Sequence, residues 1–204
     1  MVESTVALVL LGCLVLFFSV NLHNILKVRT RRGEMRAYAE VERPAGFVVG
    51  LAAAGTLAYF LEVFLYLFLA FTNLLSMMEA FPFFLSLGIY AKIAGLILTL
   101  CGTAIFAWSV VVRGHYAVSW EMPENQRLVT GGPYRCVRHP SYLGYFLMFI
   151  GFSLIWPSLL TAFPLLAIPG YYHLTFEEER LLILRFGREY EEYQNRTGRF
   201  IPKL

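Results

Sequence analysis

The stretch that decides the fold is TVALVLLGCLVLFFSVNLHNIL, residues 5–26, which carries no charged side chain. A helix that crosses a bilayer needs about 20 consecutive, predominantly apolar residues, so this stretch is long enough to span a membrane. A cleaved signal peptide begins with a basic region, whereas the start of this chain carries Glu3 and no Lys or Arg. We therefore expect a first span that is retained.

The rest of the chain has the same apolar character. Of 204 residues, 58% are hydrophobic and 15% are charged, whereas a soluble domain carries about 25% charge. This composition argues against a soluble enzyme, and an aromatic content of 16% argues against disorder. Cys13, Cys101 and Cys136 are widely spaced and form no CxxC or Cys/His pattern, so neither a disulfide framework nor a metal site is predicted.

Further apolar stretches follow the first. The last of them, residues 141–174, is too long for one span and contains Trp156-Pro157-Ser158, which predicts two helices joined by a turn at Pro157. The sequence thus predicts an all-α integral membrane protein with five transmembrane helices, the last two a helical hairpin, plus a cytoplasmic C-terminal helix. We expect Pro164 and Pro169 to kink or break the second arm of the hairpin. The expected apolar stretches are residues 5–26, 44–72, 81–112 and 141–174.

The basic residues predict the orientation in the membrane. Segments 27–43, 113–140 and 175–204 hold all but one of the 17 Lys and Arg residues. Cytoplasmic loops are enriched in Lys and Arg, so we expect a multi-pass protein with its N-terminus outside and its C-terminus in the cytoplasm. The exception, Lys92, and the carboxylate of Glu62 would both lie roughly 15–18 Å deep at 1.5 Å per residue. They are predicted to form a buried ion pair or to line a substrate or ion pathway.

The richest polar stretch is RLVTGGPYRCVRHPSYLG, residues 127–144. Its Gly-Gly-Pro run at 131–133 predicts a tight turn, in which glycine can bring backbone donors close to a ligand. Pro140 suits the first turn of a helix, which would hold Arg138 and His139 at the membrane surface. Arg135 and Arg138 are also compatible with ordinary anchoring at the membrane interface, and His139 with a simple loop position.

Three consecutive glutamates, residues 177–179, follow the hairpin, and apolar or aromatic residues at 182, 186, 190 and 193 then keep helical spacing. The glutamates are compatible with a solvated first helical turn. A carboxylate beside a basic, glycine-containing loop can also hold an ammonium group while the loop holds a carboxylate. That combination describes an amino-acid-like ligand.

Two strings of the chain resemble the signature of the isoprenylcysteine carboxyl methyltransferase and phospholipid methyltransferase superfamily. The first is LVTxGxYRxxRHPxYxG at 128–144, and the second is EExxLxxxFGxxYxxY at 178–193, followed by RFIP at 199–202. They occur in order and are separated by the apolar hairpin. The first three spans match the family only in layout.

The resemblance implies methyl transfer from S-adenosyl-L-methionine, with S-adenosyl-L-homocysteine as product, to a lipophilic acceptor at the cytoplasmic membrane face. Residues 1–112 would form three transmembrane helices with a basic loop at 27–43. Residues 113–204 would form the catalytic part, with a cofactor loop at 113–140, the hairpin at 141–174 and a tail at 175–204. The partners implied are membrane lipids and a lipophilic or lipidated substrate, with no nucleic acid and no metal.

The resemblance also implies roles for individual residues, and Glu178 would hold the ammonium group of the cofactor. The implied catalytic residues are Arg138, Glu179 and His173. The implied cofactor-binding residues are Gln126, Arg127, Leu128, Val129, Tyr134, His139, Pro140, Ser141, Tyr142 and Glu178.

This chain departs from the family pattern at two positions. Gln126 stands where the family often has His, and Leu174 stands where the isoprenylcysteine branch has an Arg that orients the substrate carboxylate. Either His173, Arg138 or Arg180 takes over that role, or the acceptor differs. A prenylcysteine-type carboxylate is the leading acceptor, and a phospholipid head-group amine or a small thiol is the alternative. A non-catalytic membrane scaffold or a small transporter is a more remote possibility.

Overall fold

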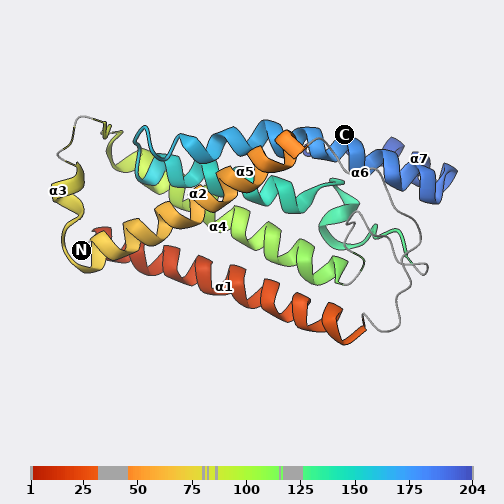
Figure 1. Ribbon diagram of the computed structural model, residues 1–204, viewed down its shortest axis with the longest axis horizontal. Helices are drawn as coiled ribbons and strands as arrows, with labels where there is room; N and C mark the ends of the chain where they lie inside the picture. The colour runs from red at the N-terminus through yellow and green to blue at the C-terminus, as the bar shows by residue number, and fades with distance from the viewer. Residues whose placement is uncertain are drawn as a thin grey trace.

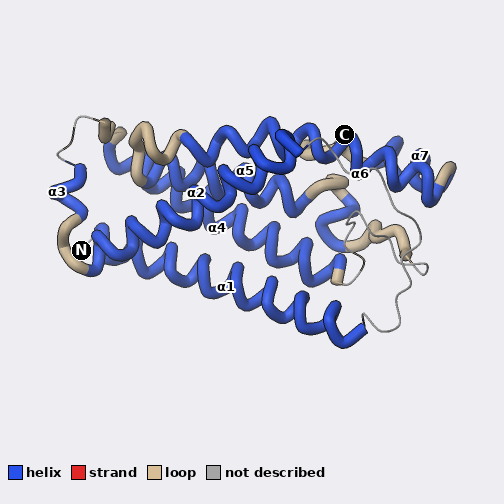
Figure 2. The backbone as a smooth tube through the Cα atoms, in the orientation of Figure 1, coloured by secondary structure: helices blue, strands red, loops and turns tan. Residues whose placement is uncertain are grey.

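The computed structural model describes residues 2–31, 46–79, 81, 83–85, 87–114, 116 and 126–203. Its α-helices and two 3-10 helices (η) are α1 Val2–Arg31, α2 Gly46–Phe71, α3 Leu75–Glu79, α4 Gly88–Arg113, η1 Gly132–Arg135, α5 Pro140–Ile155, η2 Phe163–Leu166, α6 Ala167–Phe186 and α7 Arg188–Arg196. This described part contains no β-strand (Figure 2). The prediction of a helical protein is confirmed.

Three of these helices, α1 over Glu3–Lys27, α2 and α4, are long and apolar enough to cross a membrane. Helix α5 is also apolar but has only 16 residues. At 1.5 Å per residue it is about 24 Å long, which is less than the roughly 30 Å thickness of the hydrocarbon core. The protein is therefore a multi-pass membrane protein with three candidate spans, and the count of five is not confirmed.

The long helices α1, α2, α4, α5 and α6 run along the long axis of one bundle (Figure 1). The N-terminus and α3 lie at one end of it, and α7 and the segment 126–139 lie at the other. Most of the expected basic loop at 27–43 lies outside the described residues. The same holds for residues 115 and 117–125 of the expected loop at 113–140.

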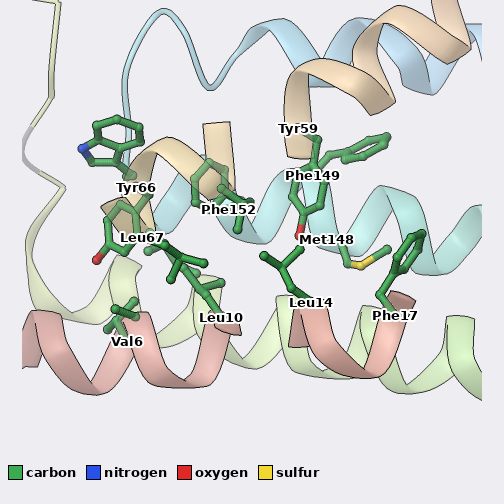
Figure 3. Close-up of a cluster of buried hydrophobic side chains, with 14 of the residues drawn as sticks. Val6, Leu10, Leu14, Phe17, Tyr59, Tyr66, Leu67, Met148, Phe149 and Phe152 are labelled. Atoms are coloured by element: carbon green, nitrogen blue, oxygen red, sulfur yellow. The ribbon is translucent and has the colours of Figure 1, made fainter. Parts of the chain in front are cut away.

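The core is formed where α1, α2 and α5 meet. Figure 3 shows side chains of α1 pointing toward those of α2 and α5. Lipid tails are as apolar as these side chains, so close packing stabilises this contact more than exclusion of water does. The labelled members of the cluster are Val6, Leu10, Leu14 and Phe17 from α1, Tyr59, Tyr66 and Leu67 from α2, and Met148, Phe149 and Phe152 from α5.

Helices α4 and α5 approach each other closely at two glycines. A Cβ added to Gly102 would lie 2.6 Å from the carbonyl oxygen of Gly144, and one added to Gly144 would lie 2.8 Å from that of Gly102. Only residues without a side chain allow this approach. The contact fixes the first turns of α5 against α4, which matters because the polar loop leads directly into α5.

The hairpin differs from the prediction in its second arm. The turn at Pro157 is confirmed, since α5 ends at Ile155. Pro164 lies in η2, and Pro169 lies in the first turn of α6, where a missing N–H breaks no hydrogen bond. The second arm is therefore broken around Pro164, as expected, since α6 begins only at Ala167, whereas the expected kink at Pro169 is wrong. Helix α6 runs without interruption to Phe186, so the first part of the expected tail is the same helix as the second arm.

The expected pairing of Glu62 with Lys92 is wrong. The Nζ atom of Lys92 lies 3.9 Å from Oε1 of Glu79, and Oε2 of Glu62 is buried without a hydrogen-bond partner among the described residues. Because α4 begins at Gly88, Lys92 lies only about 6 Å from its start. Glu62 lies nine residues before the end of α2, which is about 13 Å from that end. The two charges therefore lie at different depths.

Candidate functional site

The polar loop turns sharply before it enters α5. Gly132 has φ +57°, a conformation that favours glycine, and it begins the turn η1 that contains the buried Tyr134. Pro140 is the first residue of α5 and His139 is its N-cap. The predicted tight turn and the predicted start of this helix are both confirmed.

The end of the chain holds this loop in place. The backbone N–H groups of Arg138 and His139 donate to the carbonyl oxygens of Gly198 and Arg199, at 2.8 and 3.2 Å, and the N–H of Gly198 donates to Cys136 at 3.3 Å. The hydroxyl of Tyr193, on α7, donates to the carbonyl oxygen of Tyr134 at 2.7 Å. Segments separated by about 60 residues in the chain thus form one rigid unit. That the residues around 198 close over the loop was not predicted.

Glu179 is the centre of a polar network beneath the loop. Only 4% of the residue is exposed. Its Oε1 atom accepts from Nε of Arg138 at 2.9 Å and contacts Nε2 of His139 at 3.0 Å. Its Oε2 atom accepts from Nη2 of Arg199 at 2.7 Å and from Nε2 of Gln194 at 3.1 Å. Arg138 also donates to the carbonyl oxygens of Gln194 and Thr197. Two of the three predicted catalytic residues, Glu179 and Arg138, are therefore strongly engaged.

The ionisation of this network follows from its contacts. Burial opposes the charge on Glu179, but the hydrogen bonds from His139, Arg199 and Arg138 outweigh it and hold the pKa of the carboxyl well below its usual range. Burial would likewise lower the pKa of His139, but the hydrogen bonds to Glu178 and Glu179 outweigh it and raise the pKa of the imidazole. The lowered pKa makes the carboxylate of Glu179 a weak base near neutral pH.

Glu178 points to the other side of His139. Its Oε1 atom accepts from the hydroxyl of Tyr142 at 2.5 Å, and its Oε2 atom lies 3.4 Å from Nδ1 of His139. Unlike Glu179, Glu178 has no Arg or Lys partner in the described structure. It lines a pocket between the loop, the start of α5, and helices α6 and α7.

This pocket is the candidate site. Nine of the ten predicted cofactor residues line it, and the tenth, Pro140, is buried at the start of α5. The lining residues are Arg113, Tyr116, Gln126, Arg127, Leu128, Val129, Tyr134, Arg138, His139, Ser141, Tyr142, Glu178, Leu182, Tyr190 and Tyr193.

Three polar atoms of the lining are buried without a hydrogen-bond partner in the described part of the chain. They are Nε of Arg113, Oε1 of Gln126 and the hydroxyl oxygen of Tyr190. Buried polar groups are nearly always satisfied in proteins, and an unsatisfied one needs an explanation. Together with Glu178, they offer an N–H donor, a carbonyl acceptor, a hydroxyl and a carboxylate to a ligand. No group of three His, Cys, Asp or Glu side chains suited to a metal ion occurs in the described ranges.

Other predicted residues lie elsewhere. His173 is exposed on α6, with its ring near Tyr172 and Phe176, and is not among the lining residues. Arg180 is exposed and lies 3.9 Å from Glu177. Leu174 is buried, with 6% exposed. The structure does not bring His173 or Arg180 to the pocket.

Three lining residues were not predicted from the sequence to belong to the site: Arg113, Tyr116 and Tyr190. Arg113 ends α4 and is half-buried, and no ion pair joins it to a described carboxylate. In the sequence it has the position of an ordinary basic residue at a membrane interface. Only the packing of α4 against α5 brings it to the pocket.

Comparison with known proteins connects this site to a family. Residues 90–189 match the phospholipid methyltransferase family. Over 113 residues the chain is 31% identical to protein-S-isoprenylcysteine O-methyltransferase of Tribolium castaneum, covering 53% of this chain and 40% of that protein. The human protein of the same name is 30% identical over 118 residues, covering 55% of this chain and 42% of that protein.

Residues 90–189 are thus similar to the phospholipid methyltransferase family, and about half of the chain is similar to curated isoprenylcysteine methyltransferases. A probable member from Oryza sativa subsp. indica is 29% identical over 118 residues, covering 62% of that protein. The chain thus spans about half the length of the curated relatives it matches. A solved eukaryotic isoprenylcysteine carboxyl methyltransferase is similar over 79% of this chain and 54% of that one, with 23% identity and a TM-score of 0.49. The family match includes most of α4 and all of α5 and α6, hence Arg113 and Glu178, and it ends before residues 198–199, which hold the loop in place.

Proposed function

We propose that this protein is an S-adenosylmethionine-dependent methyltransferase that methylates a lipophilic carboxylate of the prenylcysteine type. The observation that carries the proposal is one pocket in which Glu178 faces three unsatisfied polar atoms, on Arg113, Gln126 and Tyr190. Relatives named for O-methylation of protein S-isoprenylcysteine support the same reaction class.

The lining of the pocket fits the cofactor. The carboxylate of Glu178 would hold the ammonium group of the amino-acid part. Gln126 would bind the polar edge of the adenosine part, with Leu128 and Val129 against its apolar surface. The rings of Tyr134, Tyr190 and Tyr193 line the same pocket, and aromatic rings favour a cation such as a sulfonium.

The reaction needs alignment more than proton transfer. When bound, the cofactor supplies a methyl carbon that the lone pair of the acceptor attacks in line, while the carbon–sulfur bond breaks and its electrons remain on sulfur. The protein would hold the two reactants in line and keep water away. Glu179 serves poorly as a base, because its pKa is lowered. An acceptor that is already anionic, such as a carboxylate, needs no base, whereas an ammonium head group must first lose a proton.

We propose that Arg113 holds the carboxylate of the acceptor in place of the arginine that the isoprenylcysteine branch has at position 174. The earlier candidates fit this role less well, because Arg138 is bound to Glu179 while His173 and Arg180 lie outside the pocket. Arg127 lines the pocket but is exposed. Arg113 is half-buried, and its Nε is unsatisfied.

We further propose that α5 and α6, with the turn between them, complete a five-span arrangement. The N-terminus would lie outside and the pocket at the cytoplasmic face. The concentration of Lys and Arg in segments 27–43, 113–140 and 175–204 supports this orientation. Apart from Ser141 and Tyr142, the residues that line the pocket come from the second and third of these segments.

A two-stage experiment tests the function. Calorimetry on the purified chain should detect binding of S-adenosylhomocysteine. A labelled methyl donor should then transfer its methyl group to a prenylcysteine acid, and not to phosphatidylethanolamine or a small thiol. Folded protein that gives no binding heat would refute cofactor use. Transfer to the amine or the thiol would support methyltransferase activity but refute a prenylcysteine carboxylate as the acceptor.

A further inference from the structure

A second cavity lies beside the first residues of α1 and the end of α3. These two elements meet at the end of the bundle opposite to α7 (Figure 1). Its volume is about 450 Å³, and it is lined by the first residues of α1 and α4, the end of α3 and the end of α5. The charged residues that line it are Glu3, Glu79 and Lys92. The methyl-transfer site uses none of them.

One side of the cavity suits an anion. Leu87, Gly88 and Ile89 line it, and they form the start of α4, where no side chain caps the helix. The first N–H groups of a helix lack intrahelical acceptors and attract negative charge. Lys92, one turn further along, adds a full positive charge on the same side.

The other side suits a cation. Glu3 lies in the first turn of α1, and Glu79 is the last residue of α3. The distance of 3.9 Å between Nζ of Lys92 and Oε1 of Glu79 exceeds that of a hydrogen bond. Burial raises the pKa of the Glu79 carboxyl, Lys92 lowers it, and Glu3 raises it again. The carboxylate is thus only partly compensated, and a bound ammonium group would complete its contacts.

A buried donor at the wall of the cavity also lacks a partner. Trp156 lines the cavity and is fully buried, and its indole N–H has no hydrogen-bond acceptor among the described residues. A buried N–H without an acceptor is costly. An acidic pair or an uncapped helix alone would not identify a site, but this unsatisfied donor is an independent sign that an acceptor is missing.

The surroundings of the cavity are those of a membrane interface. The cavity lies where α1 and α4 enter their apolar spans. Leu85, Leu87 and Ile89 line it and are 62%, 49% and 48% exposed. Exposed apolar side chains of this kind can contact the acyl chains of a lipid, whereas a free phosphate or a soluble amine has no acyl chain to contact them.

We propose that this cavity binds the head group of an ethanolamine phospholipid. The phosphate would lie at the start of α4 beside Lys92, with the indole N–H of Trp156 as a further donor. The primary ammonium group would lie between Glu3 and Glu79. This lipid is a bound partner at the end of the bundle opposite to α7, and it is separate from any methyl acceptor.

Thermal unfolding of the purified full chain in detergent tests the site. Dioleoyl phosphatidylethanolamine should raise the Tm by several degrees more than the choline or glycerol lipid with the same chains. A choline group cannot donate hydrogen bonds to the carboxylates, and a phosphoglycerol group brings no cation. Glu79→Gln and Lys92→Gln should each lose the specific gain. The control variants Arg188→Gln and Glu192→Gln change an exposed ion pair at the other end of the molecule, and they should keep the specific gain in Tm. An equal gain with all three lipids, or a gain retained in both cavity variants, would overturn the proposal.

A second measurement, on the wild-type chain, tests lipid binding in this cavity even if those variants fail to fold. A photoactivatable phosphatidylethanolamine is cross-linked to the wild-type chain, and the labelled peptides are mapped by mass spectrometry. Labels on peptides that contain residues 3, 79 to 92 or 156, displaced by unlabelled ethanolamine lipid and not by choline lipid, support the site. Labels confined to other peptides, or displaced equally by both lipids, refute it.

Discussion

Glu178 and Glu179 are consecutive in α6 and contact opposite nitrogens of one imidazole, with Glu178 Oε2 3.4 Å from Nδ1 of His139 and Glu179 Oε1 3.0 Å from Nε2. Glu179 receives the guanidinium groups of Arg138 and Arg199. Among the described residues, Glu178 receives only a tyrosine hydroxyl and the imidazole. The pair therefore divides two roles, because one carboxylate holds the loop to α6 and the other retains capacity for a ligand.

Glu178→Gln should weaken binding of S-adenosylhomocysteine about 10- to 100-fold, because a charged hydrogen bond contributes roughly 1.5–3 kcal/mol. The fold should persist, since Gln can still accept from Tyr142. Calorimetry measures the change. Glu177→Gln is the matched control, because the side chain of Glu177 is 47% exposed and its one ion pair within the described part of the chain is with Arg180. Unchanged affinity in Glu178→Gln would remove the ammonium-binding role.

Glu179→Gln should lower stability at neutral pH by about 3–5 kcal/mol, because it leaves Arg138 and Arg199 without their shared carboxylate. The pKa of Glu179 is lowered in the folded protein. Its stabilising contribution is therefore fully present above the unfolded pKa of about 4.3 and is lost as the pH falls through the folded pKa. The gap in Tm between wild type and Glu179→Gln should narrow as the pH is lowered below that value. A constant gap from pH 7 to pH 3 would contradict the assignment.

Gly144→Ala should destabilise the protein and also weaken cofactor binding. The added Cβ would lie 2.8 Å from the carbonyl oxygen of Gly102 and 2.9 Å from Cβ of Phe106, so α4 and α5 must move apart. Overpacking of this kind costs roughly 1–3 kcal/mol. The shift would displace His139 and Tyr142 at the start of α5. Gly50→Ala is the control, since nothing lies within 4 Å of a Cβ there. Equal Tm values for the two variants would refute the close approach.

The local structure of the site could be predicted because its signals are local. Pro140 marks the start of α5, and Gly132 marks the turn before it. The spacing of Leu182, Phe186, Tyr190 and Tyr193 predicted one apolar face, and these side chains do pack together. The turn at Pro157 was predicted for the same reason.

The errors concern contacts between distant segments and the exact depth of residues. The apolar stretch at 81–112 does not reveal that α4 begins at Gly88, and this shift moves Lys92 from the interior of the membrane to the end of the helix. Pro169 suggests a break only until its position in the first turn of α6 is known. Arg113 enters the pocket through packing of α4 against α5, which no local pattern records.

The variant Arg113→Gln tests whether Arg113 binds the carboxylate of the methyl acceptor or the carboxylate of the cofactor. If Arg113 holds the acceptor, the KM for a prenylcysteine acid should rise about 10- to 100-fold, as expected for a lost charged contact. The affinity for S-adenosylhomocysteine should stay within about twofold, because Glu178 is intact. Arg188→Gln makes the same change of charge at a side chain that is 90% exposed, and it should alter neither quantity. A weaker affinity for S-adenosylhomocysteine, with unchanged affinity for its decarboxylated analogue, would assign Arg113 to the cofactor carboxylate instead. That outcome would refute its role toward the acceptor, and Leu174 would then indicate an acceptor without a carboxylate.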